Sequence, residues 1–303
     1  LHKEIIMKNI CVIGSLNMDL VVNVDTMPKP GQTIIGSNFK EVPGGKGANQ
    51  AVAAARLGAK VYMVGCVGDD AYGQMMIESL HENRVDTTYV ITKKGVSTGT
   101  AHITLAEGDN SIIVLKGAND LVGIEEIDRA WSIISTAEIV LLQYEIPMDT
   151  IAYVIKKCKE QGIKVLLNPA PFTETPREWM QSVAYITPNE HEAKLLFEGQ
   201  TRDEILAMYP DKMIMTIGAE GVAYNQQGNH TVIIPGIKVP VVDTTGAGDT
   251  FNGAFAVSIT EGLPIKEAIA FANAAAAYSV QKIGAQGGMP LREELEDMLL
   301  CKK

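Results

Sequence analysis

The chain has 303 residues, of which 46% are hydrophobic and 20% are charged, and its formal net charge is -10 at pH 7. This length and composition predict a globular protein with a full hydrophobic core, built as one large domain or as two unequal ones. The negative charge argues against nucleic acid or an anionic membrane as partner, although a helix N-terminus or a single lysine can still bind a small anion.

The sequence carries no signal for a membrane or for secretion. No apolar run reaches the roughly 18 residues that a membrane-spanning helix needs, and the N-terminus lacks the secretory pattern. Cys11, Cys66, Cys158 and Cys301 lack C-x-x-C spacing, which is typical of reduced thiols. We therefore expect a cytoplasmic protein. Met7 resembles a natural start, so residues 1–6 are left out of the fold prediction.

Apolar runs of strand length recur along the chain and are continuous rather than alternating, which is the pattern of strands that are buried on both faces. They cover residues 9–14, 60–68, 138–145, 164–171, 183–190 and 212–218. Segments with helical periodicity lie between them, at 47–59, 73–85, 147–162 and 191–197. The alternation predicts a doubly wound α/β fold, with a mostly parallel sheet and helices on both faces.

Two segments interrupt this alternation. Residues 20–43 and 99–116 contain short, partly alternating strand patterns with turn signals and no helical pattern. They predict a small β-sheet subdomain that covers a site as a lid, whereas residues 1–19, 44–98 and 117–303 form the large α/β domain. Residues 290–300 are expected to form a terminal surface helix, and residues 197–212 leave room for only a brief helix.

The stretch DTTGAGDTFNGAF, residues 243–255, passes from glycines and threonines around Asp249 into an apolar helix pattern. Small residues at a buried helix N-terminus let an anion approach the unpaired N–H groups and the positive end of the dipole. An acid at this place has two explanations. Asp249 is either an ordinary N-cap or a group with a chemical role.

Polar residues in two further segments suggest a ligand. In GSLNMD, Asn17 and Asp19 lie two positions apart and share one side of an extended chain, as a pair suited to sugar hydroxyls. A turn with Asx hydrogen bonds is the alternative. In GGKGANQ, Lys46 and Asn49 share a helix face, and a lysine at a helix start favours a bound anion. The alternative is a solvated lysine. Neither a Walker A loop nor G-x-G-x-x-G is present.

These segments, with NPAP (168–171), TPNEHE (187–192) and TIGAEG (216–221), resemble the signatures of the ribokinase-like sugar kinase family, in that family's order and over nearly the whole chain. The Gly-Gly-Lys-Gly-Ala-Asn-Gln form is most similar to the members that phosphorylate ribose. The resemblance implies ATP-dependent phosphorylation of D-ribose at its 5-hydroxyl. Asp249 would be the general base, and the amides of Gly246, Ala247 and Gly248 would form the anion hole.

The resemblance also implies the residues that bind the substrates. Around the sugar it places Asp249 with Asn17, Asp19, Gly45, Lys46, Asn49 and Glu145. Around ATP it places Asn189, Glu192, Thr216, Gly218, Gly221, Gly248 and Asn273, with Asn189 and Glu192 in an N-x-x-E pattern linked to Mg²⁺. From its sequence context alone, Asn273 would be a polar residue bonded to the backbone of its surroundings.

Family members often hold a monovalent cation, usually K⁺, and pair into homodimers through the lid. The matching cation positions are Asp243, Thr245, Ser279, Lys282, Gly284 and Gly288. Gly287 and Gly288 depart from the family, which commonly has proline and serine there, so the resemblance predicts weaker or altered activation by K⁺. Two alternatives stay open: a kinase of the same family for deoxyribose, fructose or a nucleoside, and a catalytically silent binding regulator, against which Asp249 and Lys46 argue.

Overall fold

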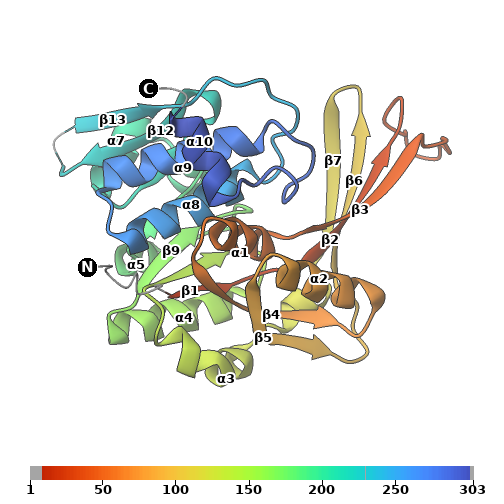
Figure 1. Cartoon of the computed structure of the whole chain (residues 1–303), viewed down its shortest axis with the longest axis horizontal. Coiled ribbons are helices and arrows are strands. Elements are labelled where there is room, and N and C mark those ends of the chain that lie inside the picture. The colour runs from red at the N-terminus through yellow and green to blue at the C-terminus, as the bar shows by residue number, and fades with distance from the viewer. Residues whose placement is uncertain (1–8, 229, 301–303) are drawn as a thin grey trace.

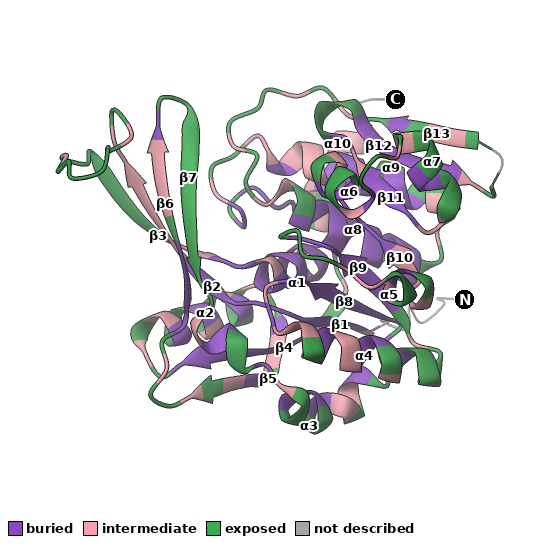
Figure 2. Ribbon diagram, turned by 180° about the vertical axis from the view of Figure 1, so that it is seen from behind, coloured by how far each residue is buried: buried purple, intermediate pink, exposed green. Residues whose placement is uncertain are grey.

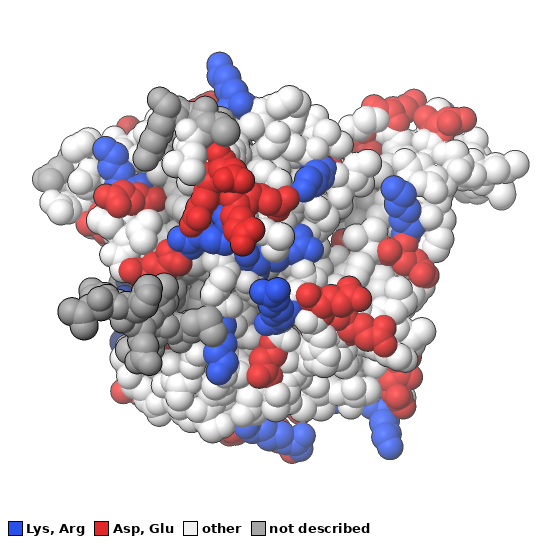
Figure 3. All heavy atoms as spheres, in the orientation of Figure 1, with Lys and Arg blue, Asp and Glu red and all other residues white. Residues whose placement is uncertain are grey.

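The computed structural model describes residues 9–228 and 230–300 (Figure 1). The first six residues and Cys301 lie outside this part of the chain. None of the helices in the described residues is long and apolar enough to cross a bilayer. On the face seen in Figure 3, lysine and arginine side chains are interspersed with acidic ones.

A six-stranded sheet forms the centre of the molecule, and its neighbouring strands are all parallel. In spatial order the strands are β10 (Tyr185–Ile186), β9 (Lys164–Asn168), β8 (Ile139–Gln143), β1 (Asn9–Ile13), β4 (Lys60–Gly68) and β5 (Val85–Lys93). The predicted mostly parallel sheet is confirmed. The strand predicted over 183–190 is much shorter, and its pairing stops before Pro188, which has no N–H to donate.

Helices cover both faces of this sheet (Figures 1 and 2). Ile10 and Val12 of β1 pack into one core cluster, and Cys11 and Ile13 pack into the other, so alternate residues of one strand reach opposite faces. The first face carries α1 (Lys46–Arg56), α2 (Ala71–Glu82), α8 (Ala247–Glu261), α9 (Ile265–Ser279) and α10 (Arg292–Leu300). The second carries α3 (Ile124–Ile134), α4 (Met148–Gln161), α5 (Arg177–Ser182), α6 (Glu190–Leu196) and α7 (Arg202–Met208).

Beyond β10, single bridges connect the central sheet to an antiparallel sheet of β11 (Ile214–Thr216), β12 (Gly221–Gln226) and β13 (His230–Pro235). A short 3-10 turn, Gly218–Glu220, joins β11 to β12, and a second one spans Gly117–Leu121. The brief helix expected between residues 197 and 212 is α7.

A separate four-stranded sheet projects from the body of the molecule (Figure 1). Its strands lie in the order β3 (Asn38–Gly44), β2 (Asn17–Asn23), β6 (Gly99–Ala106) and β7 (Asp109–Leu115). The central pair is parallel and the two outer pairs are antiparallel. Every residue of β7 is exposed, and the strand appears green along its length in Figure 2. The predicted small β-sheet therefore exists, and β2 begins at Asn17, before the expected lid boundary at residue 20.

Candidate active site

The first turns of α1 and α8 lie against each other at one end of the central sheet. Gly246 precedes α8 with a φ of 76°, a left-handed conformation that favours glycine. Gly253 lets the two helices approach closely, because a Cβ there would lie 2.9 Å from the Gln50 carbonyl oxygen. The contact places Asn49 and Gln50 of α1 beside Asp249 of α8.

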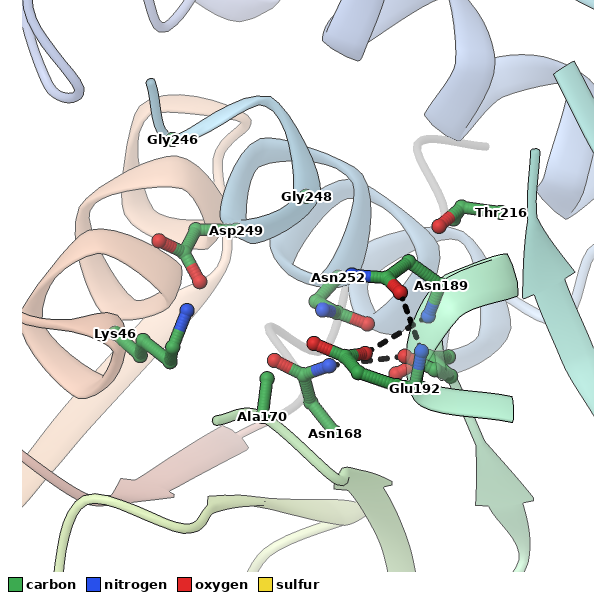
Figure 4. A pocket seen from close by; sticks show the side chains of 11 residues that line it. Lys46, Asn168, Ala170, Asn189, Glu192, Thr216, Gly246, Gly248, Asp249 and Asn252 are labelled. Carbon is green, nitrogen blue, oxygen red and sulfur yellow. Dashed lines mark hydrogen bonds between the residues drawn. The ribbon is translucent and has the colours of Figure 1, made fainter. Parts of the chain in front are cut away.

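A cavity of about 210 Å³ opens beside these two helices (Figure 4). Besides α1 and α8, its lining comes from the end of β9, the start of α6 and β11. The predicted site residues that line it are Lys46, Asn189, Glu192, Thr216, Gly246, Gly248 and Asp249. The lining residues that were not predicted are Asn168, Ala170, Thr187 and Asn252.

Asp249 is not the N-cap of α8, so that explanation is wrong. The N-cap position is held by Gly246, and Asp249 lies inside the first turn, where it is 7% exposed. Its two carboxylate oxygens accept hydrogen bonds from side chains of α1. Asn49 Nδ2 donates to Oδ2 at 3.0 Å, and Gln50 Nε2 donates to Oδ1 at 3.1 Å. The carboxylate therefore faces a neighbouring helix at the edge of the cavity.

Lys46 carries the positive charge of the site, and its ammonium group points toward Asp249 (Figure 4). Burial opposes the charge on Lys46, but the carboxylates of Asp249, Glu145, Glu192 and Asp19 outweigh it and raise the pKa of the lysine. A solvated lysine over a glycine turn does not describe this position. Lys46 is held charged at a place where acidic groups converge.

Asp19 and Glu192 both have raised pKa values. Burial raises the pKa of Asp19 to about 7, the nearby charges of Glu145 and Asp249 add to this effect, and Lys46 opposes it. Burial also raises the pKa of Glu192, against a hydrogen bond from the Asn189 backbone and the charge of Lys46. The site thus concentrates more acidic than basic groups.

Asn17 and Asp19 lie on β2 of the small sheet, in extended backbone rather than in an Asx turn. Glycines opposite them make the space for their side chains. A Cβ at Gly44 would lie 2.4 Å from Asp19 Oδ2, and one at Gly99 would lie 2.2 Å from Asn17 Oδ1. Asn17 Oδ1 also accepts a hydrogen bond from Asn119 Nδ2 at 2.7 Å.

Glu145 stabilises the start of α1. Its Oε2 accepts a hydrogen bond from the backbone N–H of Lys46 at 3.1 Å and another from the Ser15 hydroxyl. Ser15 Oγ in turn accepts from the N–H of Gly47 at 3.2 Å. The carboxylate thereby satisfies the N–H of Lys46, and the Ser15 hydroxyl that it holds satisfies the N–H of Gly47; neither donor has a partner within α1. Gly45 precedes the helix with a φ of 87°.

The predicted nucleotide residues fall into two groups. Asn189 and Glu192 form the capping box of α6, in which each side chain accepts a hydrogen bond from the other's backbone N–H at 2.8 Å. With Thr216 and Gly248 they line the cavity. Gly218, Gly221 and Asn273 lie outside its lining; Asn273 Nδ2 donates to the Ile234 carbonyl at 3.1 Å.

Asp243 links the two loops in which a cation was expected. Its carboxylate accepts hydrogen bonds from the N–H of Thr245 at 2.9 Å and from the N–H of Gly284 at 2.8 Å. Burial opposes the charge, but these hydrogen bonds dominate and lower the pKa of Asp243. Because both side-chain oxygens are engaged, the main-chain oxygens of the loops are the better cation ligands.

The remaining predicted cation residues are also engaged within the protein. Ser279 Oγ donates to the Ala276 carbonyl, and Lys282 pairs with Glu294 at 3.6 Å. A Cβ at Gly288 would lie 2.0 Å from the Ser279 carbonyl oxygen, so the backbone here leaves no room for a side chain. Among the described residues there is no group of three or more His, Cys, Asp or Glu side chains that could hold a metal ion.

The comparisons with known proteins agree with this arrangement. The family model described as pfkB family carbohydrate kinase matches residues 7–292. The chain belongs to the pfkB family of carbohydrate kinases. This pfkB kinase is 53% identical to the ribokinase of Bacillus subtilis (strain 168) over 293 residues. The alignment covers 97% of this chain and 100% of the relative.

Solved structures place the fold in the same family. The ribokinase from Thermotoga maritima matches with a TM-score of 0.88 and 38% identity, over 97% of this chain and 99% of that one. The ribokinase of Arabidopsis thaliana complexed with ribose and ATP matches with a TM-score of 0.87 and 35% identity, over 97% and 99%. The expected family, the fold class and the nature of the enzyme, an ATP-dependent carbohydrate kinase, are confirmed.

Proposed function

We propose that this pfkB kinase transfers the γ-phosphoryl group of ATP to the primary 5-hydroxyl of D-ribose, giving D-ribose 5-phosphate and ADP. The observation that carries the proposal is the buried Asp249 carboxylate, which lies at the start of α8 and beside Lys46 at the edge of one cavity. The names of the relatives support ribose as the acceptor, as does the relative complexed with ribose and ATP.

Asp249 acts as the general base in this mechanism. It accepts the proton of the attacking hydroxyl as the new O–P bond forms and the bond between the γ-phosphorus and the ADP oxygen breaks. Amide donors on both of its oxygens hold the carboxylate in place at the edge of the cavity. A positioned base contributes about 10²- to 10⁴-fold to a rate.

The start of α8 binds the transferring phosphoryl group. Amides in the first turn of a helix have no partner within it, and the helix dipole favours negative charge there. Gly248 lines the cavity and no atom lies within 4 Å of where its Cβ would be, so a phosphate has room to approach. Positioning and electrostatics of this kind account for most of the catalysis in phosphoryl transfer.

The sugar lies between the two sheets in our proposal. Asn17 and Asp19 of the small sheet bind its hydroxyls together with Gly45, Lys46, Asn49 and Glu145 of the large domain. The small sheet, residues 20–43 and 99–116 with the start of β2, is the lid. ATP contacts Asn189, Glu192 and Thr216, with Gly218, Gly221 and Asn273 farther along toward the adenine.

Mg²⁺ enters with the nucleotide, since this ion is commonly bound by one or two carboxylates together with substrate phosphates. Glu192 lines the cavity and supplies a carboxylate of this kind. Main-chain oxygens of the Asp243–Thr245 and Ser279–Gly288 loops would hold K⁺, which would supply positive charge near the anion hole.

We also propose that the protein forms a homodimer and is cytoplasmic. The apolar residues of β7, of which Ile113 is 64% exposed and Leu115 is 56% exposed, support pairing of two lids into a homodimer. Cys11, Cys66 and Cys158 are free and buried, which supports a reducing, cytoplasmic location.

The direct test is ADP release with Mg²⁺-ATP and a panel of acceptors: ribose, 2-deoxyribose, fructose, adenosine and fructose 6-phosphate, each with and without K⁺. We expect turnover selective for ribose. Selective turnover of another acceptor would replace ribose within the same mechanism. Binding of ribose without any ADP release would contradict the proposal and favour a silent binding regulator.

A further inference from the structure

Behind Asp249 lies a chain of buried side-chain amides that the reaction as described above does not use. Gln50 of α1 and Gln143 of β8 are completely buried. Gln143 Nε2 donates to Gln50 Oε1 at 2.7 Å, and Gln50 Nε2 donates both to Asp249 Oδ1 at 3.1 Å and to Asn168 Oδ1 at 3.2 Å. Side chains of β8, β9 and α8 thus meet at one amide of α1.

One backbone carbonyl fixes the donor and acceptor of every hydrogen bond in this series of amides. Asn168 Nδ2 donates at 2.9 Å to the backbone carbonyl of Thr187, which can only accept. Asn168 must therefore turn its oxygen toward Gln50. Gln50 in turn must present its NH₂ group to Asn168 and to Asp249, and its own oxygen must face the NH₂ group of Gln143.

At the far end of this series of amides, one buried oxygen is left without a hydrogen bond. Gln143 Oε1 is buried and has no hydrogen-bond partner among the described residues. It fits only because Gly14 has no side chain; a Cβ there would lie 2.1 Å from this oxygen. Buried polar atoms are rarely left unsatisfied, so each exception calls for an explanation. The orientation of Gln143 is explained by its donation to Gln50.

The second oxygen of Asp249 has a matching support. Asn49 Nδ2 donates to Oδ2, and Asn49 Oδ1 accepts from Gln286 Nε2 at 3.1 Å. Both oxygens are thus held by amides whose opposite ends are fixed by other residues. With one directed amide donor on each oxygen, the arrangement fixes the plane of the carboxylate.

We propose that Gln50 is a positioning residue for the phosphoryl transfer, which orients the Asp249 carboxylate, and that Gln143 and Asn168 set the direction of the Gln50 amide. This inference rests on the proposed role of Asp249 as the base. Gln50 lies outside the lining of the cavity and acts through Asp249 rather than on a substrate.

The test compares Gln50→Met, Gln50→Glu and Gln143→Met with wild type in saturating ribose and Mg²⁺-ATP. A hydrogen bond to a charged group is worth enough to lower kcat about 10- to 100-fold in Gln50→Met. KM for ribose and for ATP should change less than threefold. A loss in kcat with little change in either KM is the result expected of a residue that orients the base and touches neither substrate.

The other two variants sharpen the test. Gln50→Glu keeps the shape but replaces the amide donor with a second carboxylate beside Asp249, so we expect a larger loss of kcat than in Gln50→Met. Gln143→Met alone should lower kcat by less than Gln50→Met. Added to Gln50→Met, it should lower kcat no further, because Gln143 acts only through Gln50.

Thr150→Val is the matched control, because it removes another buried hydrogen bond, from Thr150 Oγ1 to the Val122 carbonyl at 2.7 Å, outside the site. It should lower the melting temperature and leave kcat unchanged. If the Gln50 variants behave like this control, the inference is overturned. If Asp249→Asn also keeps wild-type kcat, the proposed function itself fails. Loss of kcat in Asp249→Asn alone leaves the function intact and removes only the role of Gln50.

Discussion

Replacing Asp19 with asparagine should stabilise the ligand-free protein at alkaline pH. The pKa of Asp19 is raised from 3.8 to about 7, mainly by burial and then by Glu145 and Asp249. Between these two pH values the folded state binds a proton that the unfolded state releases, so stability is lost as pH rises through this window. Above pH 7 the full cost is present, and asparagine, which has no charge, avoids it.

The magnitude follows from the raised pKa. The interval from 3.8 to about 7, at about 1.36 kcal/mol for each pH unit, corresponds to about 4 kcal/mol. Asp19 remains partly exposed, so solvent screening lowers the expected gain to about 2 kcal/mol. For a chain of 303 residues this corresponds to a rise in melting temperature of roughly 3 °C.

The assay is thermal unfolding of ligand-free wild type and Asp19→Asn at pH 4 and at pH 8. The two proteins should melt at similar temperatures at pH 4, and the variant should melt higher at pH 8. The same variant should bind ribose more weakly, because the Asp19 carboxylate that destabilises the free enzyme is the one proposed to accept hydrogen bonds from the sugar hydroxyls. A difference in melting temperature that is equal at both pH values would refute the reasoning.

Two further substitutions test other parts of the site. Gly248→Ala adds a methyl group that meets no atom within 4 Å, so the melting temperature should stay level or rise. The value of kcat for ADP release should fall at least about tenfold, because the methyl group crowds the phosphate. An unchanged kcat would show that no phosphate approaches Gly248. Asp243→Asn places an NH₂ group against a backbone donor, which should lower the free energy of unfolding by about 1–3 kcal/mol. It should also shift the KCl dependence of ADP release. An unaltered KCl titration would contradict a cation site in these loops.

Much of the fold could be predicted because the strands of a parallel sheet are buried on both faces. Runs such as residues 138–145 and 164–171 are continuously apolar for this reason, and β8 and β9 lie within them. The same signal misled at residues 183–190, where Pro188 limits the pairing of β10. The exposed strands of the small sheet were found through alternation and turns.

The site was predictable only where its chemistry leaves a local pattern. The glycines before α8, the acid in its first turn and the lysine at the start of α1 are such patterns. The sequence alone also allows Asp249 to be the N-cap of α8, because a sequence pattern locates the start of a helix only to within a few residues.

Other residues of the site leave no local pattern. Gln50, Gln143 and Asn168 come from separate segments, and nothing in their own neighbourhoods distinguishes them from ordinary buried amides. Their significance lies in the direction of hydrogen bonds that exist only once α1, β8 and β9 have packed together. The raised pKa of Asp19 likewise depends on acids brought together from distant parts of the chain.

The most direct test of the central claim is kcat for ribose 5-phosphate formation in Asp249→Asn, measured at saturating ribose and Mg²⁺-ATP beside wild type. Loss of the general base predicts a kcat about 10²- to 10⁴-fold lower, in a protein that still unfolds cooperatively and still binds ribose. A kcat within a few-fold of wild type would contradict the assignment of Asp249 as the base.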